Sequence, residues 1–254
     1  MLKKRLIQKL LLKQGRVVKG VRFGSLRDVG HPVTNARIYD AQSVDELIFL
    51  DIMAGPENRQ TLFDVISRTA EEVFMPFCVG GGVRAVDDIR RLLLAGADKV
   101  AINTAAVESP ALVSDGARLF GAQCIVVSVD FRRRDGRSVV VTHGGDLDTN
   151  QDVLEHVQRS VDRGAGEILL TSIDRDGTMR GYDLEVTRQV ADAVPVPVIA
   201  SGGAGTLQHL VDAVQDGHAA AAAVGSLFHF TDQSPIKARA FMRVAGIDVR
   251  SEAA

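Results

Sequence analysis

Two glycine-rich turns, each placed directly after an apolar stretch, are the features of this sequence best suited to chemistry. Residues 80–82 (Gly-Gly-Gly) follow one stretch and residues 201–205 (Ser-Gly-Gly-Ala-Gly) follow the other. Such turns between a strand and a helix expose backbone N–H groups, which bind anions such as phosphate. Gly82 and Gly203 lie 121 residues apart in a chain of 254. The sequence therefore predicts a duplicated scaffold with a phosphate-binding turn in each half.

Two carboxylates end apolar stretches in the same manner. Asp130 closes residues 125–129, and Asp51 closes residues 46–50. A carboxylate at the end of a buried strand is partly shielded from water, which tunes its pKa for general acid–base catalysis. The alternative for Asp130 is a helix cap or an ion pair with one of the arginines at 132–134. The sequence leaves both interpretations open.

Two further segments suit a polar or anionic substrate. Residues 172–178 (Ser-Ile-Asp-Arg-Asp-Gly-Thr) are typical of a loop that binds polar groups, and residues 13–20 combine glycines with cations. The second segment predicts a mobile loop that closes over a phosphate, with an ordinary solvated loop as the alternative.

The elements that must position these residues alternate regularly along the chain. Eight β-type runs are expected at 5–12, 46–52, 76–81, 97–103, 123–130, 166–173, 196–201 and 220–226. Amphipathic helical patterns follow most of them, at 59–72, 85–95, 108–119, 150–163, 183–193 and 206–216. Because no linker interrupts this alternation, the sequence predicts one domain over residues 1–254, a (βα)8 barrel made of two similar halves. In such a barrel the carboxyl ends of the strands carry the chemistry.

Composition argues against several classes of function. Thirty basic and 32 acidic residues give a net charge of −2, which indicates neither nucleic acid nor a membrane as partner. No apolar run approaches the roughly 18 residues of a membrane span. The histidines show no metal-ligand spacing, and Cys78 and Cys124 are expected to be reduced residues in buried strands. The sequence thus predicts a cytoplasmic protein without metal or cofactor.

The internal repeat can be followed by position. An offset of 121 relates residues 103–104 to 224–225 and residues 50–52 to 171–173. An offset of 119 relates Asp130 to Leu11, so one half has a carboxylate where the other has a leucine.

Charged residues begin four of the apolar runs, at the end of the barrel opposite the glycine turns. They are Arg5, Glu46, Lys99 and Glu167. They are either separately exposed to solvent or joined in a closed ring of ion pairs, and their spacing does not decide between the two.

Over nearly its whole length the sequence resembles the cyclase (HisF) subunit of imidazole glycerol phosphate synthase. The resemblance is carried by residues 15–20, 45–52, 79–83, 96–106, 164–178 and 200–205. It implies a (βα)8 barrel with two phosphate sites and a glutaminase partner, forming a heterodimer at the barrel bottom. Ammonia released by that partner would travel through the barrel, and the four charged residues at the bottom would form its gate.

The resemblance also implies roles for individual residues, with Asp130 as a catalytic group. One phosphate would be held by Gly82, Asn103 and Thr104. The other would be held by Asp176, Gly177, Gly203, Gly225 and Ser226. The remaining substrate-binding positions are Lys19, Asp51, Thr171 and Ser201.

One departure from the family pattern bears directly on the reaction. The family places a second catalytic aspartate near the end of the first strand, within a Cys-Leu-Asp-Val-type run, and this sequence has Lys9-Leu10-Leu11-Leu12 there. Loss of a general acid or base typically costs about 10²–10⁴-fold in rate. The Leu-Leu-Leu-Lys start and the Gly-Ser-Leu-Phe ending at 225–228 are similar to paralogues of surface-polysaccharide pathways. Those paralogues are associated with acetamidino groups on sugars, made with glutamine-derived ammonia.

Three functions therefore follow as hypotheses. The first is a synthase subunit that channels ammonia to a phosphorylated or sugar-nucleotide substrate. The second is a histidine-pathway cyclase in which another carboxylate, such as Asp51, compensates for Leu11. The third is a non-catalytic barrel that scaffolds or activates its glutaminase.

Overall fold

Eight parallel strands close into a barrel in the computed structural model, which describes residues 3–53 and 59–250. Neighbouring barrel strands pair in the order β10-β11-β12-β1-β4-β5-β6-β7, and a β7–β10 pairing closes the circle. Their bounds are β1 Arg5–Lys13, β4 Glu46–Asp51, β5 Phe77–Gly80, β6 Lys99–Ile102, β7 Ile125–Arg134, β10 Glu167–Ser172, β11 Val198–Ser201 and β12 Ala221–Val224. The predicted (βα)8 fold is confirmed.

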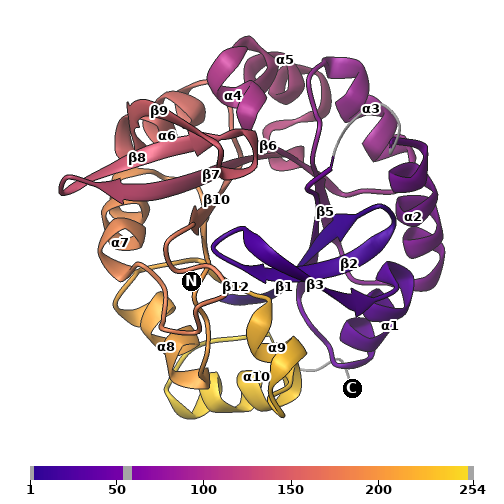
Figure 1. Cartoon of the computed structure of the whole chain (residues 1–254), viewed down its shortest axis with the longest axis vertical. Helices are drawn as coiled ribbons and strands as arrows, with labels where there is room; N and C mark the ends of the chain where they lie inside the picture. Colours follow the sequence, from indigo (N-terminus) through magenta and orange to yellow (C-terminus); the bar gives the residue numbers. More distant parts are fainter. Residues whose placement is uncertain (1–2, 54–58, 251–254) are drawn as a thin grey trace.

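Helices surround the strands on the outside, as the view along the barrel in Figure 1 shows. They are α1 Pro32–Ala41, α2 Arg59–Glu72, α3 Val86–Leu94, α4 Thr104–Glu108, α5 Ala111–Phe120, α6 Val153–Asp162, α7 Leu184–Ala193, α8 Leu207–Gln215, α9 Ser226–Phe230 and α10 Pro235–Val244. In the described part of the chain, none of them has the length and apolar character needed to span a membrane.

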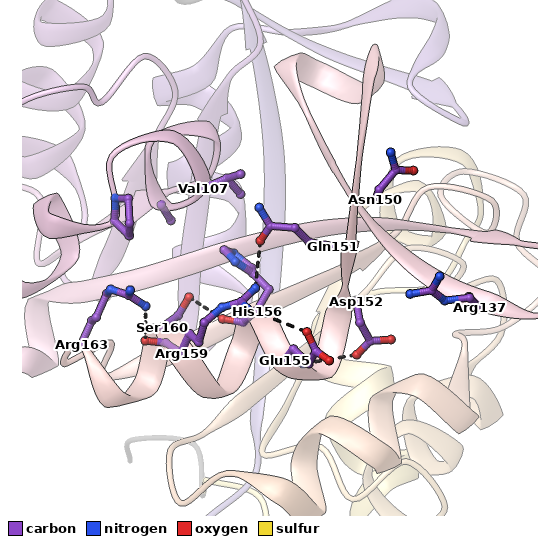
Figure 2. Close-up of a pocket in the computed structure, with 12 residues that line it drawn as sticks. Val107, Arg137, Asn150, Gln151, Asp152, Glu155, His156, Arg159, Ser160 and Arg163 are labelled. Atoms are coloured by element: carbon purple, nitrogen blue, oxygen red, sulfur yellow. Dashed lines mark hydrogen bonds and ion pairs between the residues drawn. The ribbon is translucent and has the colours of Figure 1, made fainter.

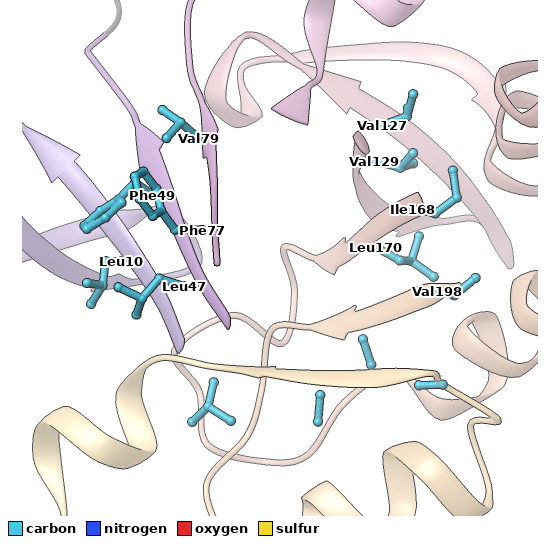
Figure 3. Packing of buried hydrophobic residues seen from close by; sticks show 14 of the residues in the cluster. Leu10, Leu47, Phe49, Phe77, Val79, Val127, Val129, Ile168, Leu170 and Val198 are labelled. Carbon is cyan, nitrogen blue, oxygen red and sulfur yellow. The ribbon is translucent and has the colours of Figure 1, made fainter. Parts of the chain in front are cut away.

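Strand alternation divides the buried side chains into two groups. Successive residues of a strand point to opposite faces, so every second residue points into the barrel. Leu10, Phe49, Val79 and Leu170 point outward and pack in the layer between strands and helices (Figure 3). The inner group is smaller, and its members are Ile7, Ile48, Cys78, Ala101, Val126, Leu169, Ile199, Ala221 and Ala223.

Each half of the barrel adds an antiparallel extension to its first strand. In the first half β1 continues into β2 (Arg16–Val21) and β3 (Gly24–Gly30), and in the second half β7 continues into β8 (Arg137–Thr142) and β9 (Leu147–Asp152). Both extensions project beside the barrel opening in Figure 1. They confirm the two-fold repeat.

The strand register places Leu11 and Asp130 at equivalent positions. Leu11 pairs with Leu50 across β1 and β4, and Asp130 pairs with Thr171 across β7 and β10. Leu50 and Thr171 are related by the 121-residue offset of the repeat. The barrel therefore presents a carboxylate at this level in its second half and an apolar side chain in its first.

Several local predictions were wrong. Residues 13–20 form a strand pair rather than a loop, because β2 bonds to both β1 and β3. Residues 150–152 belong to β9, and α6 begins only after Asp152, whose carboxylate caps it by accepting the N–H groups of Leu154 and Glu155. Cys124 is partly exposed in a short 3-10 turn before β7, whereas Cys78 is buried in β5 as expected.

The helical pattern predicted for 108–119 is divided between two helices. The helix α4 ends at Glu108, and α5 starts at Ala111 with Pro110 at its N-cap. Proline lacks the N–H needed to continue a preceding helix, which places the break here.

Candidate active site

Four charged side chains form a closed ring across the bottom of the barrel. Arg5 bonds to Glu46 at 2.8 Å and also to Glu167. Lys99 Nζ lies 2.9 Å from a Glu46 oxygen and 2.8 Å from a Glu167 oxygen. Cations and carboxylates alternate, so each charge has two opposite neighbours. Of the two arrangements left open by the sequence, the structure contains the ring.

Burial of the ring shifts the pKa values of its charged groups. Burial raises the pKa of Glu46, and the Lys99 charge works against that increase. For Lys99, burial alone would lower the pKa, but the attraction of Glu46 and Glu167 outweighs it and raises the pKa. Both carboxylates are almost completely enclosed, with 2% and 6% of their side chains exposed. Each carboxylate in the ring therefore depends on its cations.

The inner apolar group lies between this ring and the catalytic end. Its side chains are aliphatic or small, including Cys78, Ala101, Ala221 and Ala223. An apolar interior offers no hydrogen-bond partner to an ion, so it admits a small neutral molecule far more readily than a charged one.

A second charged cluster occupies the barrel interior at the carboxyl ends of the strands. Lys9 Nζ donates to Ser201 Oγ at 2.7 Å and lies 3.7 Å from Asp176 Oδ1. Lys19 Nζ donates to both oxygens of Asp176 at 3.1 Å. Burial raises the pKa of the Asp176 carboxyl, but the Lys9 and Lys19 charges outweigh it and the net pKa is lowered.

Asp130 adjoins this cluster. Burial raises its pKa to about 6, against the opposing charge of Lys9. Its Oδ2 accepts a hydrogen bond from Asn103 Nδ2 at 2.9 Å. The neighbouring Thr171 Oγ1 is buried beside Asp130, and its hydroxyl works against the increase in the Asp130 pKa. A carboxyl group with a pKa of about 6 is suited to proton transfer with a bound molecule.

The nearby arginines do not pair with Asp130. Arg132 and Arg134 bond to Asp148, and Arg133 bonds to Asp183 at 2.7 Å. The alternative in which Asp130 serves an ion pair with one of them is therefore not what the structure contains.

Of the residues predicted to hold the second phosphate, Asp176 and Gly225 contact Lys19. A Cβ added at Gly225 would lie 3.1 Å from Lys19 Cε, so the lysine crosses directly over this glycine. Ser226 is buried at the start of α9. Gly177 has φ +72° and Gly203 has φ +115°, and a Cβ at either would meet a backbone oxygen at 2.2 or 2.1 Å. These two glycines permit close chain crossings whether or not a phosphate binds.

The first-half residues are less completely assembled. Thr104 Oγ1 accepts the N–H of His143 at 3.1 Å and lies 3.4 Å from Asn103 Oδ1. Gly82 has φ +64° in the turn after β5. Asp51 is separate from this group: its carboxylate accepts the N–H of Met53, and burial raises its pKa. The structure thus links Asn103 with Asp130 but does not bring Asp51 to either.

Lys9 is the site residue that sequence reasoning missed. It stands within the run Gln8-Lys9-Leu10-Leu11-Leu12, where the surrounding leucines suggest plain core. Strand alternation would have found it, because Lys9 shares the inward face with Ile7 and Leu11.

A separate cavity of about 470 Å³ lies on the flank of the barrel, between the α4–α5 turn and α6 (Figure 2). It contains none of the predicted site residues. Arg137, Arg159 and Arg163 line it together with the buried His156, whose pKa is lowered to about 4 chiefly by burial. Across the described residues, no group of three or more His, Cys, Asp or Glu side chains could hold a metal ion.

The fold and these two charged clusters define a (βα)8 enzyme scaffold with its polar centre at the carboxyl ends of the strands. The sequence model of the family described as "Histidine biosynthesis protein" matches residues 5–234. The chain belongs to this family of histidine-biosynthesis enzymes.

The ring of ion pairs predicts that removing one of its cations strongly destabilises the fold. Lys99→Met leaves two enclosed carboxylates short of a partner and should lower the free energy of unfolding at pH 7.5 by about 3 kcal/mol. The loss should shrink at pH 5, since protonation relieves a carboxyl group whose folded-state pKa is raised. Urea denaturation at both pH values measures it.

The matched control is Arg16→Met, which removes one cation from an ion pair with Asp28 that is half exposed on both sides. Because solvent screens this exposed pair, that change should cost far less stability than Lys99→Met. Equal losses for Lys99→Met and Arg16→Met would contradict an enclosed ring.

Asp130 predicts a pH-dependent gain in stability. A carboxyl group whose folded-state pKa lies above its unfolded value destabilises the fold above that pKa, and the penalty disappears below the unfolded pKa. Asp130→Asn should therefore raise the free energy of unfolding by about 3 kcal/mol at pH 7.5, with a gain close to zero below pH 4. Denaturation across this range measures the difference. A gain that does not vary with pH would show that Asp130 is not held with a raised pKa.

Proposed function

We propose that this chain is a synthase subunit that receives ammonia from a glutaminase partner through the barrel. It supports incorporation of that ammonia into a phosphorylated or sugar-nucleotide substrate, as in acetamidino modification. The observation that carries the proposal is the order of layers along the barrel axis: a charged ring, an apolar interior and a polar cluster. This order suits passage of a small neutral nitrogen nucleophile toward a polar reaction centre.

Ammonia fits this interior better than ammonium does. The neutral molecule loses little on entering an apolar conduit, whereas an unpaired cation loses its hydration. The ring of Arg5, Glu46, Lys99 and Glu167 spans the entrance with paired charges. Opening one ion pair would suffice to admit a small molecule, which is the action expected of a gate.

The bottom face carries exposed apolar side chains suited to a partner. Phe74 is 99% exposed and Leu94 is 80% exposed, and both follow the carboxyl ends of outer helices. Helices of a (βα)8 barrel run opposite to its strands, so these ends share the face of the charged ring. Val244, 90% exposed at the end of α10, lies at the same end. Large exposed apolar groups around a conduit entrance support docking of the protein that supplies the ammonia.

The catalytic end supports a reaction other than the usual cyclisation. The position equivalent to Asp130 in the first half is Leu11, which cannot exchange a proton. A cation, Lys9, occupies the next inward position below it. The pair of opposed carboxylates is therefore replaced by one carboxylate and one ammonium group.

A histidine-pathway cyclase is the second candidate, and membership of the histidine biosynthesis family favours it. It requires a carboxylate to replace the one missing at Leu11. Asp51 is the nearest sequence candidate, but its carboxylate is committed to the Met53 N–H group.

Turnover of the imidazole glycerol phosphate synthase substrate with ammonium chloride separates the two candidates. The wild-type chain should turn this substrate over at least about 10²-fold more slowly than a cyclase that has both carboxylates. Leu11→Asp should increase the rate. Normal wild-type turnover, together with rescue of a histidine auxotroph lacking its own cyclase, would establish the cyclase and exclude the proposal.

Docking of a glutaminase can be tested at the bottom face. A glutaminase subunit encoded in the same genome should form a 1:1 complex with the chain and hydrolyse glutamine faster in it. Phe74→Asp and Leu94→Asp should each raise the dissociation constant at least about tenfold, because each places a buried charge where the wild-type side chain makes an apolar contact. Sedimentation and glutaminase assays measure both effects.

Leu147→Asp is the matched control, because Leu147 is 50% exposed at the start of β9, away from the bottom face. Binding unaffected by Phe74→Asp and Leu94→Asp, or weakened equally by Leu147→Asp, would contradict docking here. If Asp130→Asn leaves the output of the complex unchanged while Phe74→Asp abolishes it, the barrel acts only as a scaffold or activator.

A further inference from the structure

Lys9 is a primary amine enclosed inside the barrel. It lies on the inward face of β1, between Ile7 and Leu11, and is 4% exposed. A lysine in a barrel interior loses hydration and gains nothing for the apolar core, so its retention requires partners or a function. Lys9 forms a long ion pair with Asp176, whose closest oxygen is 3.7 Å from Lys9 Nζ.

A second lysine shares the same carboxylate. Lys19 Nζ lies 3.1 Å from both oxygens of Asp176, closer than Lys9 does. Lys9 and Lys19 thus share one carboxylate, and both charges lower the pKa of Asp176, while Lys9 also donates to Ser201 Oγ at 2.7 Å. Enzymes that use lysine as a nucleophile enclose it in apolar surroundings or place it beside another cation. Lys9 is enclosed, and it lies close enough to the Lys19 cation for its charge to lower the pKa of Lys19.

A phosphorylated substrate would place a carbonyl group near Lys9. Lys19 contacts Asp176 and also crosses over Gly225, one of the glycines at the second-half turn. Lys9 adjoins the same Asp176 from the interior side. The Lys9 amine and the second-half turn are thus linked through Lys19 and their shared Asp176, so a short sugar phosphate is the class of ligand that would bring a carbonyl group toward Lys9.

We propose that Lys9 forms an iminium ion with the carbonyl carbon of a phosphorylated aldehyde or ketone. Lys9 first gives a proton to the Asp130 carboxylate. The resulting neutral amine attacks the carbonyl carbon, so a C–N bond forms as the C=O π bond breaks, and the oxygen gains a proton while the nitrogen loses one to give a carbinolamine. Protonation of that hydroxyl then breaks the C–O bond and releases water, leaving the carbon doubly bonded to Lys9 Nζ. No oxidant, reductant or further reactant is needed.

The surrounding groups match the proton transfers of this sequence. Asp130 adjoins the cluster, and its pKa of about 6 allows it both to take a proton and to return one at neutral pH. Thr171 Oγ1 is enclosed and lies beside Asp130 in the strand register. It is placed to bind the carbinolamine hydroxyl group before water leaves.

An iminium ion at Lys9 also explains what channelled ammonia would meet, an extension that rests on the proposed function. Ammonia emerging from the apolar interior attacks the iminium carbon and displaces the lysine. One C–N bond forms and one breaks, the positive charge moves to the substrate, and Lys9 returns as a free amine. The substrate leaves as its own iminium ion, with nitrogen from ammonia in place of its carbonyl oxygen.

Reductive trapping tests the proposal without any partner or turnover. The purified chain is incubated with dihydroxyacetone phosphate or ribulose 5-phosphate and then treated with borohydride. The expected product is a chain heavier by the mass of the probe minus one oxygen atom, with the label on the Lys9 peptide. Labelling at Lys9 should be roughly 10²-fold faster than at the exposed Lys3 and Lys237, because the phosphate positions the carbonyl.

Matched variants separate nucleophilic from structural roles. Lys9→Arg keeps the positive charge and a donor toward Ser201, and it should lose the label while retaining the wild-type melting temperature. Lys9→Met tests the same loss if the larger arginine unfolds the barrel. Lys19→Arg should still be labelled at Lys9, more slowly. Unphosphorylated dihydroxyacetone should label Lys9 at least about tenfold less, and inorganic phosphate should compete with the phosphorylated probe.

Several results would overturn the proposal: no label at Lys9 with either probe, label confined to Lys19, or label spread equally over the exposed lysines. Ammonium chloride added before borohydride should lower the trapped fraction. If ammonium does not change the trapped fraction, the iminium ion at Lys9 is still supported and only its reaction with ammonia is contradicted. Failure of the proposed function can therefore be told apart from failure of the iminium proposal.

Discussion

Enclosed charge must be compensated, and the organisation of this barrel follows from that constraint. Removing one partner of a buried ion pair costs several kcal/mol, because the remaining charge has lost its water. At the bottom, two cations and two carboxylates solve the problem by alternating around one ring. At the catalytic end, Lys9, Lys19, Asp176 and Asp130 also balance formally, but their contacts are unequal. The bottom is satisfied by its own residues, whereas the top retains capacity for a ligand.

The alternation of strand side chains determines which residues face this constraint, and it is the part of the fold that the sequence predicts best. The apolar runs in the sequence predicted all eight barrel strands, because such strands are buried on both faces. The two hairpin extensions were missed for the opposite reason. Most of β3 is exposed or partly exposed, and β9 has the sequence Leu-Asp-Thr-Asn-Gln-Asp, so neither shows an apolar alternation. Their pairing is set by the preceding strands rather than by their own composition.

The candidate site was predictable as a set of positions but not as a set of contacts. The glycine turns lie at the carboxyl ends of strands, as the repeat indicated, whereas Asp130 lies inside β7, which continues to Arg134. The same glycines also serve close chain crossings: a side chain at Gly177 would collide with Gly20, and one at Gly203 would collide with Gly181. Packing alone therefore requires glycine at these two positions, so their presence is not evidence of phosphate binding. The separate observation that favours a phosphate site is the Lys19 side chain, which crosses over Gly225. Lys9 was missed because its place in the site follows only from the alternation of side chains along β1, which points Lys9 into the barrel.

The residues near the end of β1 differ from the family pattern in a way that changes both the net charge at the carboxyl ends of the strands and the acids and bases present there. The family pattern resembled by this sequence has a neutral cysteine and an aspartate where Lys9 and Leu11 stand, so the replacement makes the interior more positive by two charges. With Lys19 and the two carboxylates Asp130 and Asp176 unchanged, a cluster of net negative charge becomes one that balances. A site with two opposed carboxylates favours a substrate that develops positive charge, whereas the balanced cluster accepts a polarised carbonyl and the negative charge that collects on its oxygen. These two positions therefore provide the balanced cluster of charges on which the proposed reaction of Lys9 with a carbonyl carbon rests.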